Sequence, residues 1–232
     1  MCFSPEMSFG SAAVLFPTGV YCCVTAARRC PRLWPAAVVP CVFAVQQAAE
    51  GLVWVGLRTP DDLLTRSAAR VYLFFALAFW PIWFSLVAVL VERPGRRRAM
   101  LAVWGTLSTG WLVVYLPALT GSDEREAHVC HSSVRYQYPD TLLGGVGKWA
   151  VRGAYMVTAG APLLICSARR VFALPVVLGT GSAGVVAVVY DHAFTSVWCL
   201  FSAVLSASIA WAIRTVPLER LAMPRQVCER VG

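Results

Sequence analysis

The chain has 232 residues, of which 58% are apolar and only 14% are charged. Soluble domains carry about a quarter of their residues as charged side chains, so this composition excludes an ordinary soluble enzyme, a disordered protein and a coiled coil. Seven membrane-spanning helices of about 20 residues would use roughly 140 residues. The remainder supplies loops and a tail and leaves no room for a separate soluble domain.

Seven apolar runs of spanning length follow one another along the chain. We therefore expect an all-α, seven-transmembrane helix bundle that forms a single integral membrane domain over 1–232. The predicted spans are 8–27, 34–57, 71–91, 99–119, 149–167, 171–190 and 193–213. The polar segment 120–148 is expected to form a solvated extracytoplasmic loop, and 214–232 a cytoplasmic tail. In the third span, Trp80-Pro81 predicts a kink, because proline cannot donate the helical hydrogen bond.

The basic residues predict the orientation of the chain. Thirteen of the 20 Lys and Arg residues fall in the first, third and fifth loops and in the tail. Cytoplasmic loops of membrane proteins carry such an excess, so we expect an extracytoplasmic N-terminus and a cytoplasmic C-terminus. The net charge of +8 then reflects topology, and no nucleic-acid partner is expected, since no binding motif accompanies it. The expected partners are the lipid bilayer and, on the cytoplasmic side, anionic lipid head groups.

Glu50 is the acid that this pattern places inside a span. A lone carboxylate there costs a few kcal/mol, so it should face the interior of the bundle. Gln46 and Gln47 precede it by four and three positions and share its helical face. Two interpretations stay open: a functional site, as intramembrane ionisable groups usually mark, or hydrogen bonds that only join helices.

A second polar stripe begins the seventh span. His192, Ser196 and Cys199 follow an i, i+4, i+7 spacing, and Cys199 lies about 10 Å deeper than His192, level with Glu50. Imidazole, thiolate and carboxylate groups are ligands for a transition metal such as zinc or copper. The predicted metal ligands are Cys2, Glu50, His192 and Cys199, with Glu50 and His192 as catalytic residues and Gln46, Gln47 and Ser196 as cofactor-binding residues. The alternative is a small apolar cysteine in a core and a histidine bonded at the membrane interface.

Further candidate groups lie in the predicted outer loop, at His128-Val129-Cys130-His131, whose spacing matches no standard zinc signature. A disulfide between Cys2 and Cys130 is a further possibility, because both residues would lie in an oxidising compartment.

Several motifs resemble those of an uncharacterised family of small bacterial multi-pass membrane proteins with an N-terminal MCFS motif. These motifs are Met1-Cys2-Phe3-Ser4, the Gln46-Gln47 and Glu50-Gly51 pairs with Trp54, and His192-Ala193-Phe194 with Ser196-Val197-Trp198-Cys199. The resemblance covers nearly the whole chain, implies the bacterial inner membrane as location and assigns no activity.

The chain is also similar, at the level of the fold, to the seven-span superfamily of alkaline ceramidases and progestin and adiponectin receptors. Those proteins hold zinc with a Ser, an Asp and several His. Here His192 and Ser196 stand where such proteins carry two His four residues apart, so this resemblance implies a fold rather than a three-His site.

The leading functional hypothesis is a polar, metal-binding pocket that opens to the extracytoplasmic face and serves a membrane-embedded enzyme. The metal would activate water for hydrolysis or take part in redox chemistry. One alternative is a small-molecule or ion transporter or sensor in which Glu50 titrates. Another is a membrane scaffold whose polar groups only pack helices.

Overall fold

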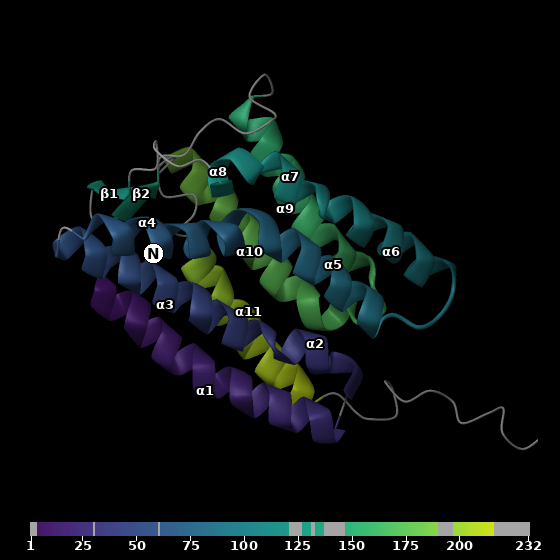
Figure 1. The fold of residues 1–232 in the computed structure, drawn as a ribbon. Helices are drawn as coiled ribbons and strands as arrows, with labels where there is room; N and C mark the ends of the chain where they lie inside the picture. Colours follow the sequence, from purple (N-terminus) through teal and green to yellow (C-terminus); the bar gives the residue numbers. More distant parts are fainter. Residues whose placement is uncertain are drawn as a thin grey trace, which may run out of the picture.

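The computed structural model of the chain describes residues 4–29, 31–59, 61–120, 127–130, 133–136, 147–189 and 197–215. Apart from one β-hairpin, the regular structure of these residues is helical (Figure 1). The first half contains α1 (Pro5–Arg29), η1 (Pro31–Leu33), α2 (Trp34–Ala37), α3 (Val39–Arg58), α4 (Asp62–Leu73), η2 (Phe74–Phe79) and α5 (Trp80–Val91). The second half contains α6 (Arg96–Ser108), α7 (Gly110–Val114), α8 (Leu116–Thr120), β1 (Ala127–Cys130), β2 (Ser133–Tyr136), α9 (Lys148–Ile165), α10 (Arg169–Val189) and α11 (Val197–Thr215).

Each predicted span overlaps a helical rod among the described residues, but the boundaries differ, and the third rod begins at Asp62, nine residues before the predicted span 71–91. The second rod runs from η1 through α3, the third joins α4, η2 and α5, and the fourth joins α6, α7 and α8 with breaks at Thr109 and Tyr115. Within the described residues, three rods are long and apolar enough to cross a membrane. They are Pro5–Arg29, Pro31–Arg58 and Asp62–Val91. The helical fold class is therefore confirmed.

The rods pack into a ring. Helix α1 packs on α3, α3 on α4, α5 on α9, α9 on α10, α10 on α11, and α11 back on α1. Helix α6 packs against α5 and is mostly exposed (Figure 1). Helix α11 also contacts α3, so α3 has neighbours on several sides. This position explains why much of α3 is buried.

Helix α1 shows how local sequence signals set helix ends. The Ser4 hydroxyl oxygen accepts a hydrogen bond from the Met7 N–H at 3.3 Å, which satisfies one of the donors that a helix N-terminus leaves unpaired. Pro5 occupies the first helical position, where no N–H is needed. Arg28 and Arg29 lie in the last turn, where a positive charge complements the helix dipole.

A π-helical turn, η2, interrupts the third rod just before Trp80-Pro81. A π-turn pairs the carbonyl of residue i with the N–H of residue i+5, which for Ala76 is Pro81, and proline has no N–H. The Tyr155 hydroxyl on α9 donates to the Ala76 carbonyl instead, at 2.7 Å. The sequence predicted a kink at Trp80-Pro81, and the structure shows a π-helical turn directly before these two residues.

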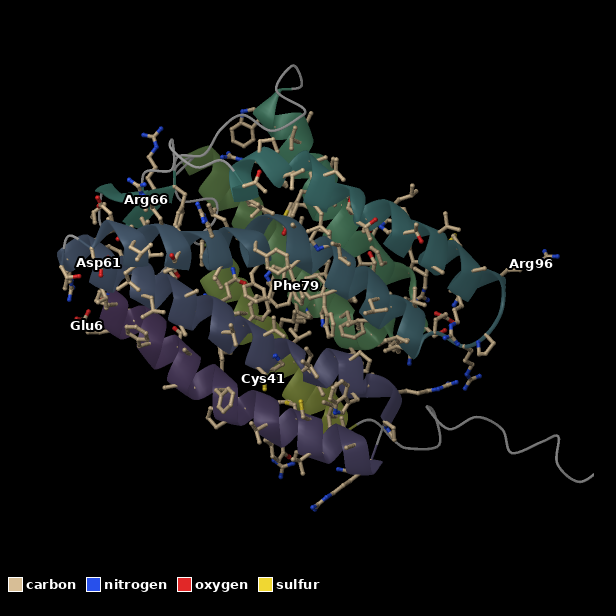
Figure 2. The ribbon with its side chains drawn as sticks, viewed as in Figure 1. Glu6, Cys41, Asp61, Arg66, Phe79 and Arg96 are labelled. Atoms are coloured by element: carbon tan, nitrogen blue, oxygen red, sulfur yellow. The ribbon has the colours of Figure 1, made fainter. Side chains whose placement is uncertain are left out.

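The bundle has two chemically different ends. At the first, the arginine end, Arg29 donates to the Arg214 carbonyl at 3.1 Å, which brings the ends of α1 and α11 together. The described arginines on segments of this end are Arg28, Arg29, Arg32, Arg93, Arg96, Arg97, Arg98, Arg169, Arg170 and Arg214. At the opposite end, the hairpin end, lie Glu6, Asp61 and Arg66 (Figure 2).

The β-hairpin covers part of the hairpin end. Strands β1 and β2 pair antiparallel, and the Tyr136 ring stacks on Tyr72 of α4 with centroids 5.0 Å apart. Val134 in β2 is fully buried in a small apolar cluster whose other buried members are Val53, Trp54, Ala68 and Ala69. We expected a solvated loop here, but Val134 is buried, whereas Val129 of the same hairpin is 52% exposed. The reason is that α3 and α4 offer an apolar surface that the loop sequence does not reveal.

Candidate functional site

The polar stripe on α3 lies inside the bundle. Gln46, Gln47 and Glu50 each have 0% of their surface exposed, and the spacing of three and four positions places them on one helical face. Gln47 and Glu50 both take part in further interactions. The sequence-based prediction that Glu50 faces the bundle interior rather than lipid is therefore confirmed.

Trp80 on α5 contacts this stripe. Its indole N–H donates to the Gln46 side-chain oxygen at 2.8 Å, and both groups are buried. The Phe43 ring, one turn before Gln46, stacks on Trp80 with centroids 3.9 Å apart. Since an indole N–H only donates, it fixes which end of the Gln46 amide faces it, the oxygen.

The other end of that amide has no partner. Gln46 Nε2 is buried and makes no hydrogen bond among the described residues. A buried donor without an acceptor costs about 1–3 kcal/mol, so such an atom in a native structure calls for an acceptor. Glu50 is four residues further along α3, and neighbours at this spacing have Cβ atoms about 6 Å apart. The side chains that carry the unpartnered amide donor and the carboxyl group are thus neighbours on one face of α3.

The packing register places this stripe relative to the hairpin. A Cβ on Gly56 would lie 2.9 Å from the Thr65 backbone nitrogen, so α3 and α4 touch there. The Trp80 contact described above marks the other end of the same antiparallel pair. On α3, Glu50 lies about midway between Gln46 and Gly56. On the opposite rod, Tyr72 lies about midway between Thr65 and Trp80. Glu50 is therefore level with Tyr72, on which the hairpin stacks.

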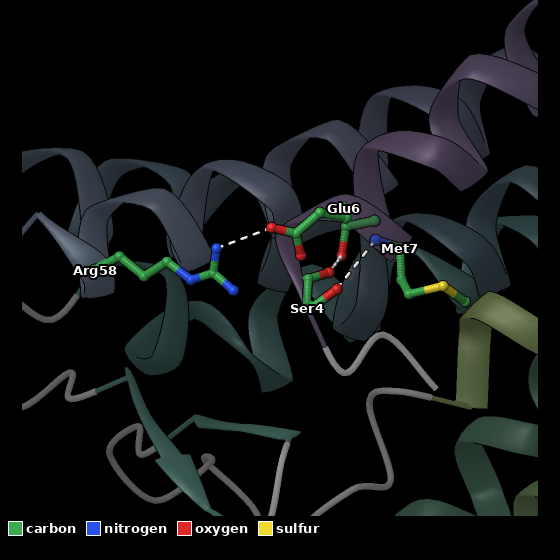
Figure 3. Close-up of polar contacts among 5 residues, drawn as sticks. Ser4, Glu6, Met7 and Arg58 are labelled. Carbon is green, nitrogen blue, oxygen red and sulfur yellow. Dashed lines mark hydrogen bonds and ion pairs between the residues drawn. The ribbon is translucent and has the colours of Figure 1, made fainter.

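Glu50 is nearer to the hairpin end than to the arginine end. It precedes Arg58, the last residue of α3, by eight positions, or about 12 Å at the rise of an α-helix. Arg58 forms an ion pair with Glu6 of α1 at 2.9 Å, and both side chains are largely exposed (Figure 3). This pair marks the bundle rim above the polar stripe.

Two serines that the sequence analysis missed lie on α11. Ser202 and Ser206 are 1% and 2% exposed, and the Ser206 hydroxyl has no hydrogen-bond partner among the described residues. They follow Cys199 by three and seven positions, so the three residues share a helical face. The sequence did contain a signal for these two serines, because the helical spacing that links His192 to Cys199 continues for two further turns.

Most of the predicted metal ligands cannot be placed beside Glu50. Cys2, His192 and Ser196 lie outside the described residues, and so does the side chain of Cys199, whose backbone is part of α11. The side chains of His128 and Cys130 are likewise outside the described part. Among the described residues, no group of three or more His, Cys, Asp or Glu side chains could hold a metal ion. The four-ligand set stays a prediction.

The N-terminal serines have structural partners. Ser4 caps α1, and Ser8, which is fully buried, donates its hydroxyl to the Ser4 carbonyl at 3.3 Å. Phe9 packs its ring on Gly51 of α3, where a Cβ would lie 2.8 Å from the ring. These contacts hold the start of α1 against the half of α3 that carries Glu50.

A second buried acid, Glu92, lies at the arginine end and was not singled out from the sequence. Its carboxylate accepts hydrogen bonds from the Ser167 backbone N–H and from the Ser167 hydroxyl, each at 2.6 Å. Burial raises the pKa of Glu92, but the Ser167 hydrogen bonds and the nearby Arg97 outweigh it and lower that pKa below its ordinary value of 4.5. This arrangement ties the end of α5 to the α9–α10 connection.

The described residues thus define a helical bundle that has rods suited to crossing a membrane and a buried polar cluster on α3. Comparison of the chain with models of protein families, with curated proteins and with solved structures gave no match. The functional conclusions rest on the fold and the site geometry, and the resemblance to a bacterial membrane protein family stays a prediction.

Proposed function

We propose that the protein is a multi-pass integral membrane protein of the bacterial inner membrane with seven crossings, an extracytoplasmic N-terminus and a cytoplasmic C-terminus. The agreement between the predicted spans and the helical rods supports this topology. The gathering of arginines at one end supports the orientation, because basic residues stay on the cytoplasmic side. That end would face anionic lipid head groups.

We propose further that the protein binds a small polar ligand or an ion at the α3 stripe, reached from the hairpin end. The observation that carries this proposal is the buried Gln46 Nε2, a hydrogen-bond donor without a partner among the described residues, four positions from the buried Glu50. An amide donor beside a carboxyl group suits a ligand that presents a hydrogen-bond acceptor next to a cationic or proton-donating group. Glu50 is then the group that exchanges a proton or a cation with the ligand.

A metal-dependent enzyme is the second candidate function. It is favoured by the buried serine face of α11, because that face includes the position of Cys199 and because α11 packs against α3. In this form of the proposal, Cys2, His192 and Cys199 join Glu50 to hold zinc or copper, with Ser196, Gln46 and Gln47 around them. Glu50 and His192 would serve the chemistry at the metal.

The deciding experiment compares full-length wild type, Glu50→Gln and His192→Ala in mild detergent and in vesicles. Elemental analysis after incubation with Zn²⁺ or Cu⁺ measures bound metal, and a trapped pH-sensitive dye measures proton flux. Ser85→Ala is the matched control, since it removes a buried hydrogen bond, to Ser108 at 3.0 Å, without touching α3. All variants are first checked for folding by size-exclusion chromatography.

Stoichiometric metal that both site variants lose, and the control keeps, supports the metal-dependent enzyme. A metal-free protein whose proton flux disappears in Glu50→Gln supports the ion-binding form. If Glu50→Gln folds and changes neither metal content nor flux, the site is overturned. If both site variants lose only stability, the polar groups serve helix packing, as in a scaffold.

A further inference from the structure

A cluster of thiols lies between α1 and α3, away from the α3 polar stripe. Cys22, Cys23 and Cys41 are free cysteines; Cys22 is fully buried, while Cys23 and Cys41 are half-buried. Cys23 Sγ contacts the Ala37 carbonyl, one turn before Cys41 along the chain, and Cys41 packs on Gly19, one turn before Cys23 on α1. Figure 2 shows Cys41 at the α1 side of the bundle. Two thiols from different helices therefore lie within one helical turn of each other at the same helix contact.

The backbones of the two helices approach closely at this point. A Cβ on Gly19 would lie 2.6 Å from the Cys41 backbone nitrogen and 3.1 Å from its Cα, and it would overlap the Cys41 sulfur. Cys23 is one turn after Gly19 on the same face of α1. A disulfide needs Cα atoms about 4.4–6.8 Å apart, and the helix crossing, which excludes even a methyl group at Gly19, keeps the two backbones close one turn from Cys23.

Each sulfur also has a carbonyl neighbour. Cys23 Sγ lies 3.5 Å from the Ala37 carbonyl oxygen, at the end of α2. Cys41 Sγ lies 3.9 Å from the Phe16 carbonyl oxygen of α1. Both thiols are thus held at the helix interface, one from each side, instead of pointing away from it.

The surroundings of Cys23 and Cys41 determine which kind of oxidant can reach their thiols. Large apolar side chains cover the outer face of α1 here, and Phe16, Val20 and Val24 are 56%, 45% and 46% exposed. In a bilayer this surface meets hydrocarbon, so a water-soluble oxidant would not reach the half-buried sulfurs. Cys23 precedes Arg29, at the arginine end, by six positions, or about 9 Å along the helix.

We propose that Cys23 and Cys41 form a reversible dithiol–disulfide pair that staples α1 to α3 and is oxidised by a lipid-soluble quinone. Two S–H bonds break and one S–S bond forms, and the two electrons and two protons pass to the quinone, which becomes a hydroquinone. Thiol reductants reverse the step by thiol–disulfide exchange. The disulfide fixes α1 to the helix that carries Glu50, but the proposal does not depend on any ligand there.

The test treats the full-length protein in lipid vesicles with a tetramethyl-substituted benzoquinone, whose ring positions are blocked against thiol addition. Wild type is expected to lose two maleimide-reactive thiols and two hydrogen atoms of mass. A crosslink between the Cys23 and Cys41 peptides should appear in non-reducing digests. After the vesicles are dissolved in detergent, dithiothreitol should restore both thiols.

Single-residue variants identify the pair. Cys23→Ser and Cys41→Ser should each abolish the crosslink. Cys22→Ala is the matched control beside the pair, and Cys166→Ala is a control at a distant buried cysteine; both should leave the crosslink unchanged. The wild-type digest is decisive even if a serine variant fails to fold. A crosslink from Cys22, a mass gain instead of a loss, or full retention of both thiols in wild type would overturn the proposal.

Discussion

Replacement of Glu92 by alanine is expected to destabilise the fold by roughly 2–3 kcal/mol. The change removes two short charge-assisted hydrogen bonds, from the Ser167 N–H and hydroxyl at 2.6 Å, and each such bond contributes about 1.5–3 kcal/mol. Two bonds at the lower end of this range sum to about 3 kcal/mol, and we expect a slightly smaller loss because Ser167 is exposed and water can replace part of it. For a chain of this size the melting temperature should fall by roughly 4–12 °C, measured by tryptophan fluorescence in detergent.

Two comparisons test the loss of stability expected for Glu92→Ala. Ser167→Ala keeps the backbone N–H bond and should cost about half as much. Because the pKa of Glu92 is lowered in the fold from its ordinary value of 4.5, its stabilisation is fully present above that value and is lost as the pH falls through the folded pKa. The gap between wild type and Glu92→Ala should therefore narrow in acid. An unchanged melting temperature, or a gap independent of pH, would refute the assignment.

Four further substitutions probe packing elsewhere. Gly56→Ala should destabilise strongly, by about 1–3 kcal/mol, since its Cβ would lie 2.9 Å from the Thr65 backbone nitrogen; Gly110→Ala, with no neighbour within 4 Å, should be neutral or slightly stabilising. Both are read from melting temperatures, and equal effects would contradict the close helix contact. Tyr155→Phe should cost about 1–3 kcal/mol because it leaves a buried carbonyl of the π-turn without a donor, and an unaltered thermal midpoint would argue against this role. Val134→Asp should detach the hairpin, since it places a charge in an apolar cluster; limited proteolysis should then cut 120–148 faster, with the helices intact, and an identical digestion pattern would show that the hairpin is not held by this residue.

Helix positions could be predicted from the sequence because the bilayer imposes a length and a polarity on each span. The predicted span 34–57 lies within the rod Pro31–Arg58, and 149–167 largely overlaps α9. The π-helical turn lies directly before Trp80-Pro81, where the missing N–H of proline predicted a kink. Each of these inferences needs only local information about consecutive residues.

The burial of Glu50 was also predictable, since the cost of a charge in hydrocarbon allows few alternatives. What the sequence could not provide is the partner of each polar group. The bond from Trp80 to Gln46 joins positions 34 apart in sequence, and nothing in either segment alone specifies the other. The same holds for Ser202 and Ser206, whose burial depends on which face of α11 turns inward.

The hairpin and the Glu92 contact show most clearly which features could not be predicted from the sequence alone. Segment 120–148 is polar in composition, yet Val134 is buried because α3 and α4 present an apolar surface to it. Glu92 and Ser167 lie 75 positions apart and meet only because α5 packs on α9. By itself, the sequence determined which segments must be helical and which costly side chain must be hidden, because both follow from transfer of local groups out of water. Only the tertiary structure decided which hidden groups meet, because pairing depends on the register and rotation of helices that are distant in the chain.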